Sequence, residues 1–162
     1  MSLLQACSKL ESLFQLECRE AIAEKLVIIS SDFKRTVETA RIIHEHFQVK
    51  EPLRLESALR ERGFGNYHLT SETNAISLFR RDYEDPTHKD SGCESLMDMV
   101  LRISRLLQSL DEEFSDKILL LVSHGDPLIA LFAVCSGVPP TERWTRIPQF
   151  TNCDIRELPN MV

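Results

Sequence analysis

The chain has 162 residues, of which 43% are hydrophobic, 27% charged and 7% aromatic. These proportions predict one globular domain over residues 1–162 and exclude a disordered tail, a collagen-like fibre and a low-complexity segment. Acidic residues outnumber basic ones by 25 to 19, for a formal net charge of −6, which argues against nucleic acid as a partner. No apolar run approaches the roughly 20 residues that span a bilayer, and signal-peptide features are lacking, so we expect no membrane association.

The cysteines are five in number and widely spaced, with no C-x-x-C pair: Cys7, Cys18, Cys93, Cys135 and Cys153. An odd number at such spacings predicts neither a disulfide framework nor a zinc ribbon. We therefore expect reduced thiols in a cytoplasmic protein, and we expect neither a metal ion nor another cofactor.

The N-terminal residues predict an amphipathic helix over residues 1–24, because apolar side chains recur there at helical spacing without Gly or Pro. The apolar stripe consists of Leu3, Cys7, Leu10, Phe14, Cys18 and Ala21. Residues 26–29 form an apolar run typical of a buried parallel strand. The polar residues 30–32 then offer caps for a second helix over residues 33–47.

The middle of the chain continues this alternation. Residues 53–55 predict a short strand, whereas the polar segment 63–92 predicts irregular structure with one helical patch near residues 75–79. A continuous apolar face predicts a long helix over residues 96–114. Residues 118–122 predict another buried strand.

The C-terminal part predicts one more helix and one more strand. Asp126 and Pro127 suit the N-cap and the first position of a helix that ends near residue 137. Residues 150–158 predict a last strand. The whole pattern predicts a three-layer α/β/α fold with a mostly parallel sheet, in which residues 1–25 are an atypical N-terminal helix.

Two strand–helix junctions carry polar residues at the sheet edge where open α/β sheets bind ligands. In the first, Lys34 and Arg35 stand in the first turn of a helix, where their charges oppose the helix dipole. A bound anion would relieve this conflict, and Arg35 can hold an anion with two N–H groups. The alternative is that both side chains point into water.

The second junction places His124 at the end of a predicted strand, and Gly125 lets the backbone approach a ligand closely. Upstream, Glu61 stands between two arginines ahead of a Gly-containing loop, where its carboxyl group can serve as a general acid. The alternatives are a structural histidine and a solvated charge cluster.

Five segments of the sequence, taken together, resemble the histidine phosphatase superfamily, whose fold is called phosphoglycerate-mutase-like. In the family's order they are I-S-S-D-F-K-R-T-V-E-T-A at 29–40, L-R-E-R-G-F-G at 59–65, G-C-E-S at 92–95, V-S-H-G at 122–125 and N-C-D-I at 152–155. The resemblance covers residues 26–158.

The resemblance implies phosphomonoester hydrolysis or phosphoryl transfer through a phosphohistidine, without a metal. It makes Arg35 a phosphate clamp, with Ser31 and Gly125 beside it in the phosphate site. Glu61 becomes the general acid that protonates the leaving oxygen, and His124 becomes the second active-site histidine, which stabilises the transferring phosphoryl group.

The implied partner is a phosphorylated small molecule or a phosphoprotein. In the family, the region that corresponds to residues 65–92 covers the active site. Arg80 and Arg81 in this region are therefore candidates for contacting an acidic substrate, or else a solvated pair.

The family's nucleophile is a histidine in an R-H-G motif near the N-terminus, and this sequence lacks that motif. Its histidines are His44, His46, His68, His88 and His124. Because the covalent route needs a nucleophile at that place, we expect an inactive or strongly impaired chain. It is then a shortened form or a diverged pseudo-phosphatase whose first strand is missing or replaced, which leaves neighbouring strands unpaired or makes them re-pair.

Two other functions stay open. One is a working phosphatase with a substitute nucleophile, for example His124 acting alone. The other is a non-catalytic interaction module, in which the N-terminal helix docks on a partner or on a second copy.

Overall fold

The computed structural model describes residues 3–13, 18–67 and 72–159. The chain divides into two compact units. The first unit consists of Met1–Arg60, Gln108–His124 and Phe150–Glu157, and the second of Glu61–Leu107, Gly125–Gln149 and Leu158–Val162. The single domain expected over residues 1–162 stays a prediction.

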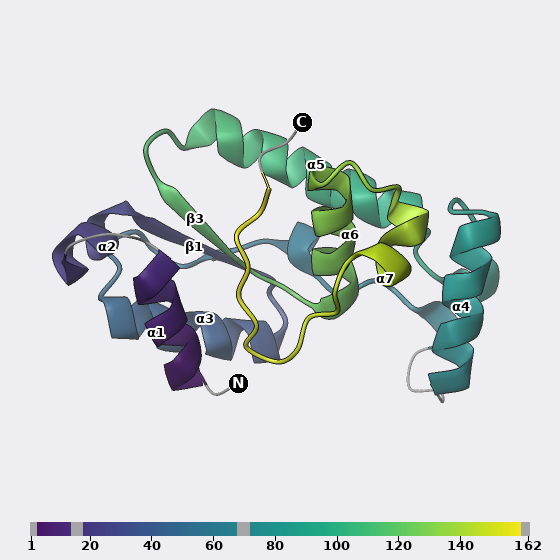
Figure 1. Cartoon of the computed structure of the whole chain (residues 1–162), viewed down its shortest axis with the longest axis horizontal. Helices are drawn as coiled ribbons and strands as arrows, with labels where there is room; N and C mark the ends of the chain where they lie inside the picture. The colour runs from purple at the N-terminus through teal and green to yellow at the C-terminus, as the bar shows by residue number, and fades with distance from the viewer. Residues whose placement is uncertain (1–2, 14–17, 68–71, 160–162) are drawn as a thin grey trace. The chain divides into compact units, whose positions relative to one another are not determined.

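The first unit is built on a parallel sheet whose described strands have the order β2-β1-β3 (Figure 1). β1 spans Leu26–Ser30, β2 spans Arg54–Leu55 and β3 spans Ile118–Val122. β1 and β3 pair directly along five residues, from Leu26 opposite Ile118 to Ser30 opposite Val122. The α/β class and the parallel sheet predicted from the sequence are confirmed.

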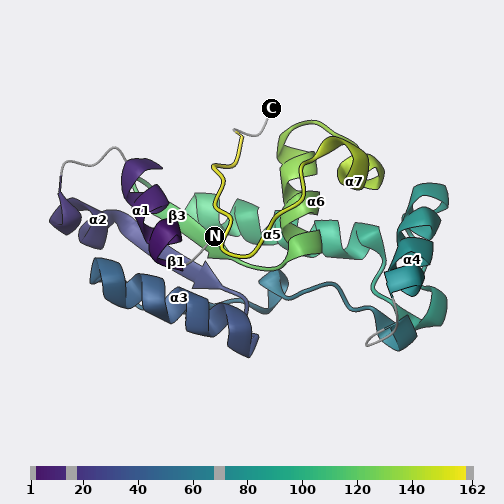
Figure 2. The same ribbon diagram turned by 60° about the horizontal axis from the view of Figure 1, so that its bottom comes forward.

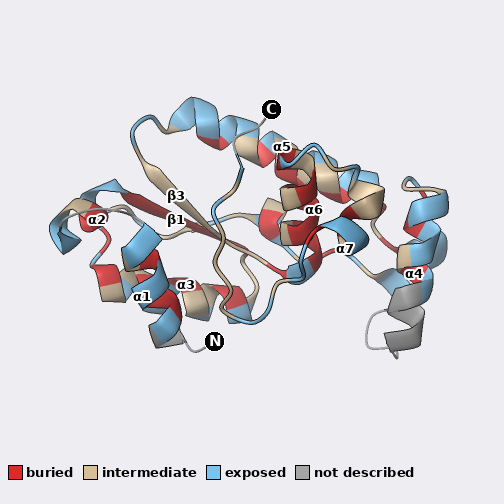
Figure 3. Ribbon diagram, in the orientation of Figure 1, coloured by how far each residue is buried: buried red, intermediate tan, exposed pale blue. Residues whose placement is uncertain are grey.

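The two longer strands differ in burial, as Figure 3 shows. Every residue of β1 is buried, whereas every residue of β3 is only partly buried. Leu26 and Ile28 of β1 belong to the buried core and β2 pairs with Ile29 and Ser30, while β3 pairs only with β1 among the described strands and packs against the core with partly buried side chains. The prediction of a buried strand is therefore confirmed for residues 26–29 and wrong for residues 118–122.

One face of the sheet packs against α1 (Leu3–Leu13) and α3 (Lys34–Phe47), which lie on the same side of the strands (Figures 1 and 2). α3 forms where the sequence predicts it. The buried side chains of this core are Cys7, Leu10, Ile22, Leu26, Ile28, Ala40, Ile43, Phe47 and Val49. Their removal from water is the largest favourable contribution to folding of the first unit.

The prediction of a single helix over residues 1–24 is wrong. α1 ends at Leu13, and a separate helix, α2, spans Arg19–Lys25. Cys18, which the stripe places on the buried face, is exposed and extended, with φ −149° and ψ 156°. Because Cys18 is extended, α2 is a separate helix with buried side chains of its own, Ile22 and Ala23. Phe14 lies outside the described residues.

The predicted last strand is also wrong, since residues 150–158 join no sheet. A turn at residues 151–154 interrupts the segment, with the N–H of Asp154 donating to the carbonyl of Thr151 at 3.0 Å. Cys153 has φ +61°, in the left-handed region, which lies outside the range of regular strand residues. Ile155 still packs against the core of the first unit.

The second unit is mainly helical and contains α4 (Glu72–Glu84), most of α5 (Leu96–Glu113), α6 (Gly125–Cys135) and α7 (Arg143–Arg146). α5 confirms the predicted long helix. α4 is longer than the patch predicted near residues 75–79, because its buried face includes the charged Asp82 beside Leu78, which hides the apolar periodicity.

The predicted N-cap role of Asp126 is wrong. α6 begins at Gly125, so Asp126 lies inside its first turn and is buried. Its carboxylate accepts from the guanidinium of Arg143 at 2.7 Å instead of capping the helix. Among the described residues no helix is long and apolar enough to cross a membrane.

Candidate active site

The ends of β1 and β3 bring two of the predicted site residues to one edge of the sheet. Ser30 and Val122 are the last residues of the paired strands, and the N–H of Ser31 donates to the carbonyl of Val122 at 2.9 Å. Because the strands are parallel, Ser31 and His124 both follow their carboxyl ends. The side chain of His124 is only 6% exposed at this edge.

Arg35, His124 and Ser31 form a connected triad of side chains. The guanidinium of Arg35 reaches the imidazole Nδ1 of His124 from two nitrogens, at 3.1 Å from Nε and 2.7 Å from the second nitrogen. The other ring nitrogen, Nε2, lies 2.9 Å from the Ser31 hydroxyl oxygen. The structure therefore brings together three of the residues that the sequence predicts for the site.

These contacts indicate which ring nitrogen of His124 carries the proton. A guanidinium only donates hydrogen bonds, so Nδ1 is an unprotonated acceptor. The proton of the neutral ring then stands on Nε2, from which it is donated to the Ser31 hydroxyl oxygen. Both N–H groups of Arg35 share the single lone pair of Nδ1, which is a weaker arrangement than two N–H groups on two separate oxygens.

The start of α3 holds Ser31 in place. The Ser31 hydroxyl oxygen accepts from the N–H of Phe33 at 3.3 Å, and the Thr36 hydroxyl donates to the Ser31 carbonyl at 2.9 Å. These contacts show why the S-S-D-x-x-x-T pattern forms a fixed turn between strand and helix. The predicted capping by residues 30–32 is wrong, since the N-cap of α3 is Phe33 and the helix has no side-chain cap; the Ser31 hydroxyl accepts from the N–H of Phe33 itself.

An aromatic ring packs among the polar groups of this edge. The Phe33 ring stands edge-on to the His124 ring with centroids 5.3 Å apart. The guanidinium carbons of Arg35 and Arg60 lie 5.2 Å and 5.7 Å from the Phe33 centroid, within the range of cation–π contacts. Arg60 also donates two hydrogen bonds to Asp32, at 2.7 Å and 2.6 Å, and these lower the pKa of that carboxyl group below its ordinary value.

The other predicted site residues belong to the second unit. Glu61 is partly buried, and its Oε1 accepts from the N–H of Arg62 at 3.0 Å. Gly125 is the first residue of α6, and a Cβ added to it meets nothing within 4 Å. The open space at Gly125 agrees with a backbone that a ligand can approach.

The two arginines proposed to contact substrate lie on α4 and are exposed. Arg81 is bound to Glu84 at 2.9 Å and to Asp90 at 3.0 Å. Arg81 is thus part of a surface ion-pair cluster, and a role of Arg80 or Arg81 in substrate binding stays a prediction.

Two of the sequence segments meet inside the second unit, at Gly63 and Glu94. The N–H of Glu94 donates to the carbonyl of Gly63 at 2.6 Å, and the N–H of Gly63 donates to a carboxylate oxygen of Glu94 at 3.2 Å. Glu94 also pairs with Arg102 of α5 at 2.6 Å. The loop that follows Glu61 is therefore fixed to the segment that opens α5.

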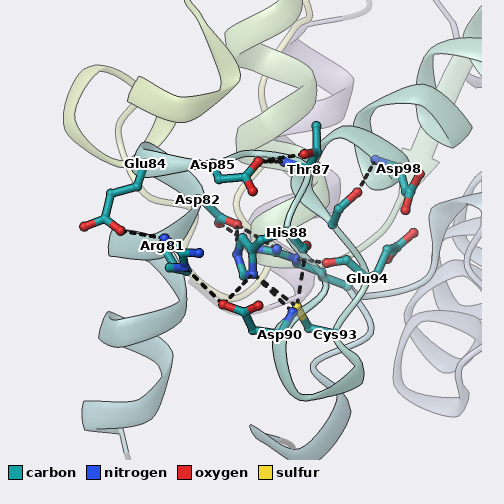
Figure 4. Close-up of polar contacts among 12 residues, drawn as sticks. Arg81, Asp82, Glu84, Asp85, Thr87, His88, Asp90, Cys93, Glu94 and Asp98 are labelled. Carbon is teal, nitrogen blue, oxygen red and sulfur yellow. Dashed lines mark hydrogen bonds and ion pairs between the residues drawn. The ribbon is translucent and has the colours of Figure 1, made fainter.

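Sequence reasoning missed a group of buried charged residues in the second unit, which Figure 4 shows in part. Its members are Arg62, Asp82, His88, Asp126 and Arg143. The sequence predicts Asp126 as an N-cap and gives no sign that any of these residues is buried. The available signal was that Arg62 directly follows Glu61 in one of the family segments.

The described residues hold no cluster of three or more His, Cys, Asp or Glu side chains that could bind a metal ion.

Comparison with known proteins identifies the family to which the chain belongs. The sequence model of the histidine phosphatase superfamily (branch 1) matches residues 16–159. The chain belongs to this superfamily, as the resemblance of its five segments implies.

Two curated relatives carry phosphatase names. The uncharacterized phosphatase PhoE of Bacillus subtilis (strain 168) is 26% identical over 121 residues, which cover 75% of this chain and 58% of the relative. The glucosyl-3-phosphoglycerate phosphatase of Mycolicibacterium vanbaalenii is 28% identical over 138 residues, which cover 77% of this chain and 60% of the relative. The chain thus spans about three fifths of the length of these relatives.

Solved structures support the same fold. A mycobacterial glucosyl-3-phosphoglycerate phosphatase in complex with inorganic phosphate has a TM-score of 0.68 and 26% identity, over 93% of this chain and 73% of that one. The alpha-ribazole phosphatase of Shigella flexneri has a TM-score of 0.66 and 19% identity, over 97% of this chain and 77% of that one. The phosphoglycerate-mutase-like α/β fold predicted from the sequence is confirmed.

Proposed function

We propose that this chain binds phosphomonoesters at the edge formed by Arg35, Ser31 and His124, with Glu61 as the proton donor for the leaving oxygen. Membership of the histidine phosphatase superfamily and its phosphatase relatives support this class of ligand. Gly125 gives a phosphate access to the start of α6. The ligand is a phosphorylated small molecule or a phosphoprotein.

The observation that carries the proposal is the contact between Arg35 and His124. Two N–H groups of Arg35 share one lone pair of Nδ1, whereas a phosphate offers each of them its own charged oxygen. Phosphate therefore competes favourably for Arg35. Once released, the neutral His124 ring can take up a proton and donate to the phosphoryl group.

We further propose that the 162-residue chain turns over slowly or not at all. The sequence has no R-H-G motif, and its first histidine is His44, on α3. β1 and β3 pair directly, so no strand stands between them to carry a nucleophile to this edge. A phosphate-binding site without a nucleophile is the property of a pseudo-phosphatase or of a shortened form.

Two alternatives lead to different results. A working phosphatase with a substitute nucleophile requires a group such as His124 to take the phosphoryl group. A docking module built on the N-terminal helix requires its apolar face to be available. Cys7 and Leu10 of α1 are each only 2% exposed and belong to the core of the chain itself, which argues for packing instead of docking.

The test combines binding and turnover. We expect calorimetry to detect inorganic phosphate binding, and we expect Arg35→Ala to weaken it at least tenfold. Arg41→Ala, an exposed arginine on the same helix, is the matched control. Hydrolysis of 4-nitrophenyl phosphate that disappears in both Arg35→Ala and His124→Ala supports a substitute nucleophile. Folded protein that binds no phosphate overturns the proposal.

As part of this proposal we place the protein in the cytoplasm. All five cysteines are free thiols, in agreement with a reducing compartment.

A further inference from the structure

The second unit contains charged side chains that are almost fully removed from water. The side chains of Arg62, Arg143 and Asp82 are 0% exposed, and that of Asp126 is 3% exposed. Burial of charges on this scale is costly unless each is paired. Replacing such a network with apolar residues is commonly neutral or stabilising, so stability alone does not account for it.

Asp82 of α4 is the centre of the network. One of its oxygens accepts from Arg62 at 2.6 Å and from Arg143 at 3.0 Å. The other accepts from Arg62 at 2.7 Å and lies 3.1 Å from Nε2 of His88 (Figure 4). Burial raises the pKa of Asp82, but its hydrogen bonds and charge interactions with Arg62 and Arg143 outweigh burial and lower the pKa below its ordinary value.

Asp126 of α6 closes the network. Its oxygens accept from Arg143 at 2.7 Å and 3.3 Å, and one of them lies 3.7 Å from Arg62. The two arginines and the two aspartates balance in charge. They join α4, α6, α7 and the segment that follows Glu61.

Two members of this network are sequence neighbours of proposed site residues. Arg62 follows Glu61, and its backbone N–H donates to the Glu61 carboxylate at 3.0 Å. The Arg62 guanidinium also donates to the carbonyl of Glu94 at 2.8 Å, so its side chain is anchored at several points. Asp126 follows Gly125 in the first turn of α6.

We infer that the network holds the Glu61 carboxyl group at a fixed position relative to the start of α6. Its positioning residues are Arg62, Asp82, Asp126 and Arg143. The network fixes the Arg62 backbone, and the Arg62 N–H orients the Glu61 side chain. This inference rests on the proposed role of Glu61 as the proton donor, because a positioned carboxyl group matters only where it meets a ligand.

A double-mutant cycle tests this inference, with phenyl phosphate as the probe and calorimetry as the readout. Arg143→Lys keeps the charge but removes the two-point contact with Asp126. We expect it to weaken phenyl phosphate binding about tenfold in the wild-type background and to have no effect in the Glu61→Gln background. Arg146 lies on the same helix as Arg143, and Arg146→Gln removes only its exposed ion pair with Glu142; this variant is the control and should change neither value.

A purely structural network gives a different result. Equal losses in the two backgrounds, or no loss in folded Arg143→Lys, overturn the inference. Asp126→Asn is the second variant if Arg143→Lys does not fold.

A ligand-free measurement separates this inference from the proposed function. We expect Arg143→Lys to shift the side-chain carboxyl carbon resonance of Glu61 and the amide proton resonance of Arg62 in the NMR spectrum of the folded protein. Unchanged resonances overturn the inference even if no phosphate ester binds. A wild-type chain that binds no phenyl phosphate contradicts the proposed function, whereas the two resonances still decide on the positioning network.

Discussion

Asp82 is a buried carboxylate whose two oxygens accept from Arg62 and Arg143 and contact His88. The substitution Asp82→Asn removes the negative charge and leaves two buried guanidinium groups with too little compensation. We therefore expect the free energy of unfolding at pH 7 to fall by about 3–5 kcal/mol. Urea unfolding followed by circular dichroism measures this change. A loss below about 1 kcal/mol would show that the network contributes no more than an exposed ion pair.

The lowered pKa of Asp82 predicts that the stability of the protein depends on pH. The pKa of Asp82 is lowered in the folded protein, so its stabilising effect is complete above the unfolded pKa of about 4. The effect is lost as the pH falls through the folded pKa. As the pH falls below about 4, the free energy of unfolding should therefore decrease more steeply in the wild type than in Asp82→Asn. Parallel curves in urea titrations would contradict the assignment.

A substitution at Gly125 should weaken ligand binding without lowering stability. An added Cβ meets nothing within 4 Å, so Gly125→Ala fits the folded chain and reduces the freedom of the unfolded one. We expect stability to stay unchanged or to rise by up to about 1 kcal/mol. Inorganic phosphate binding should weaken, because the methyl group occupies space that the ligand needs. Unchanged phosphate affinity in calorimetry would remove Gly125 from the site.

At the scale of elements, the turn at Gly65 joins two of the family segments inside the second unit. Gly65 has φ +53°, and a Cβ there would clash with the backbone carbonyl oxygen of Ser91. Gly137, just after α6, has φ +65° but open space around it. Gly137→Ala should therefore cost only the backbone strain of about 1–2 kcal/mol. Gly65→Ala should cost several kcal/mol more, because the backbone near Ser91 must also move. Thermal unfolding of both variants measures the difference, and equal losses would contradict the close approach at Gly65.

The role of α1 can be decided by one core substitution. Leu10 is 2% exposed and packs in the core with α3. Leu10→Ala should lower the free energy of unfolding by about 2–5 kcal/mol, as expected for a buried leucine. Ser8→Ala on the exposed side of the same helix is the control. If Leu10→Ala left stability unchanged but altered the mass measured by light scattering, α1 would be a docking element.

The elements that the sequence predicts correctly are those whose apolar spacing directly reports burial. α5 carries Leu96, Met99 and Ile103 at helical spacing, and β1 is a continuous apolar run that lies between two strands. The failures have local causes that periodicity does not contain. An extended Cys18 divides the N-terminal helix, and a left-handed Cys153 prevents the last strand.

The candidate site was predictable to a different degree in the two units. In the first unit, Arg35 and His124 meet because parallel strands carry them to one edge, which the strand–helix pattern implies. The buried network of the second unit could not be predicted, because an arginine or aspartate in a sequence gives no sign of burial. Only the fold brings Arg62, Asp82 and Arg143 together from separate elements.

At the scale of the whole molecule, ligand binding and folding stability are linked. A ligand that binds only the folded chain stabilises it by about 2.7 kcal/mol at a concentration one hundred times its Kd. For a chain of this length, that corresponds to a rise in Tm of roughly 5–11 °C. We therefore expect inorganic phosphate to raise the Tm of the wild type, measured against sodium chloride of equal ionic strength.

The rise should disappear in Arg35→Ala and persist in Arg41→Ala, because only Arg35 lies against His124. The chain spans about three fifths of the length of its curated relatives, so a full phosphate effect would show that this portion of the family fold forms the anion site by itself. An equal rise in Arg35→Ala would mean that phosphate acts through general exclusion from the protein surface, and the site at the ends of β1 and β3 would then have no part in it.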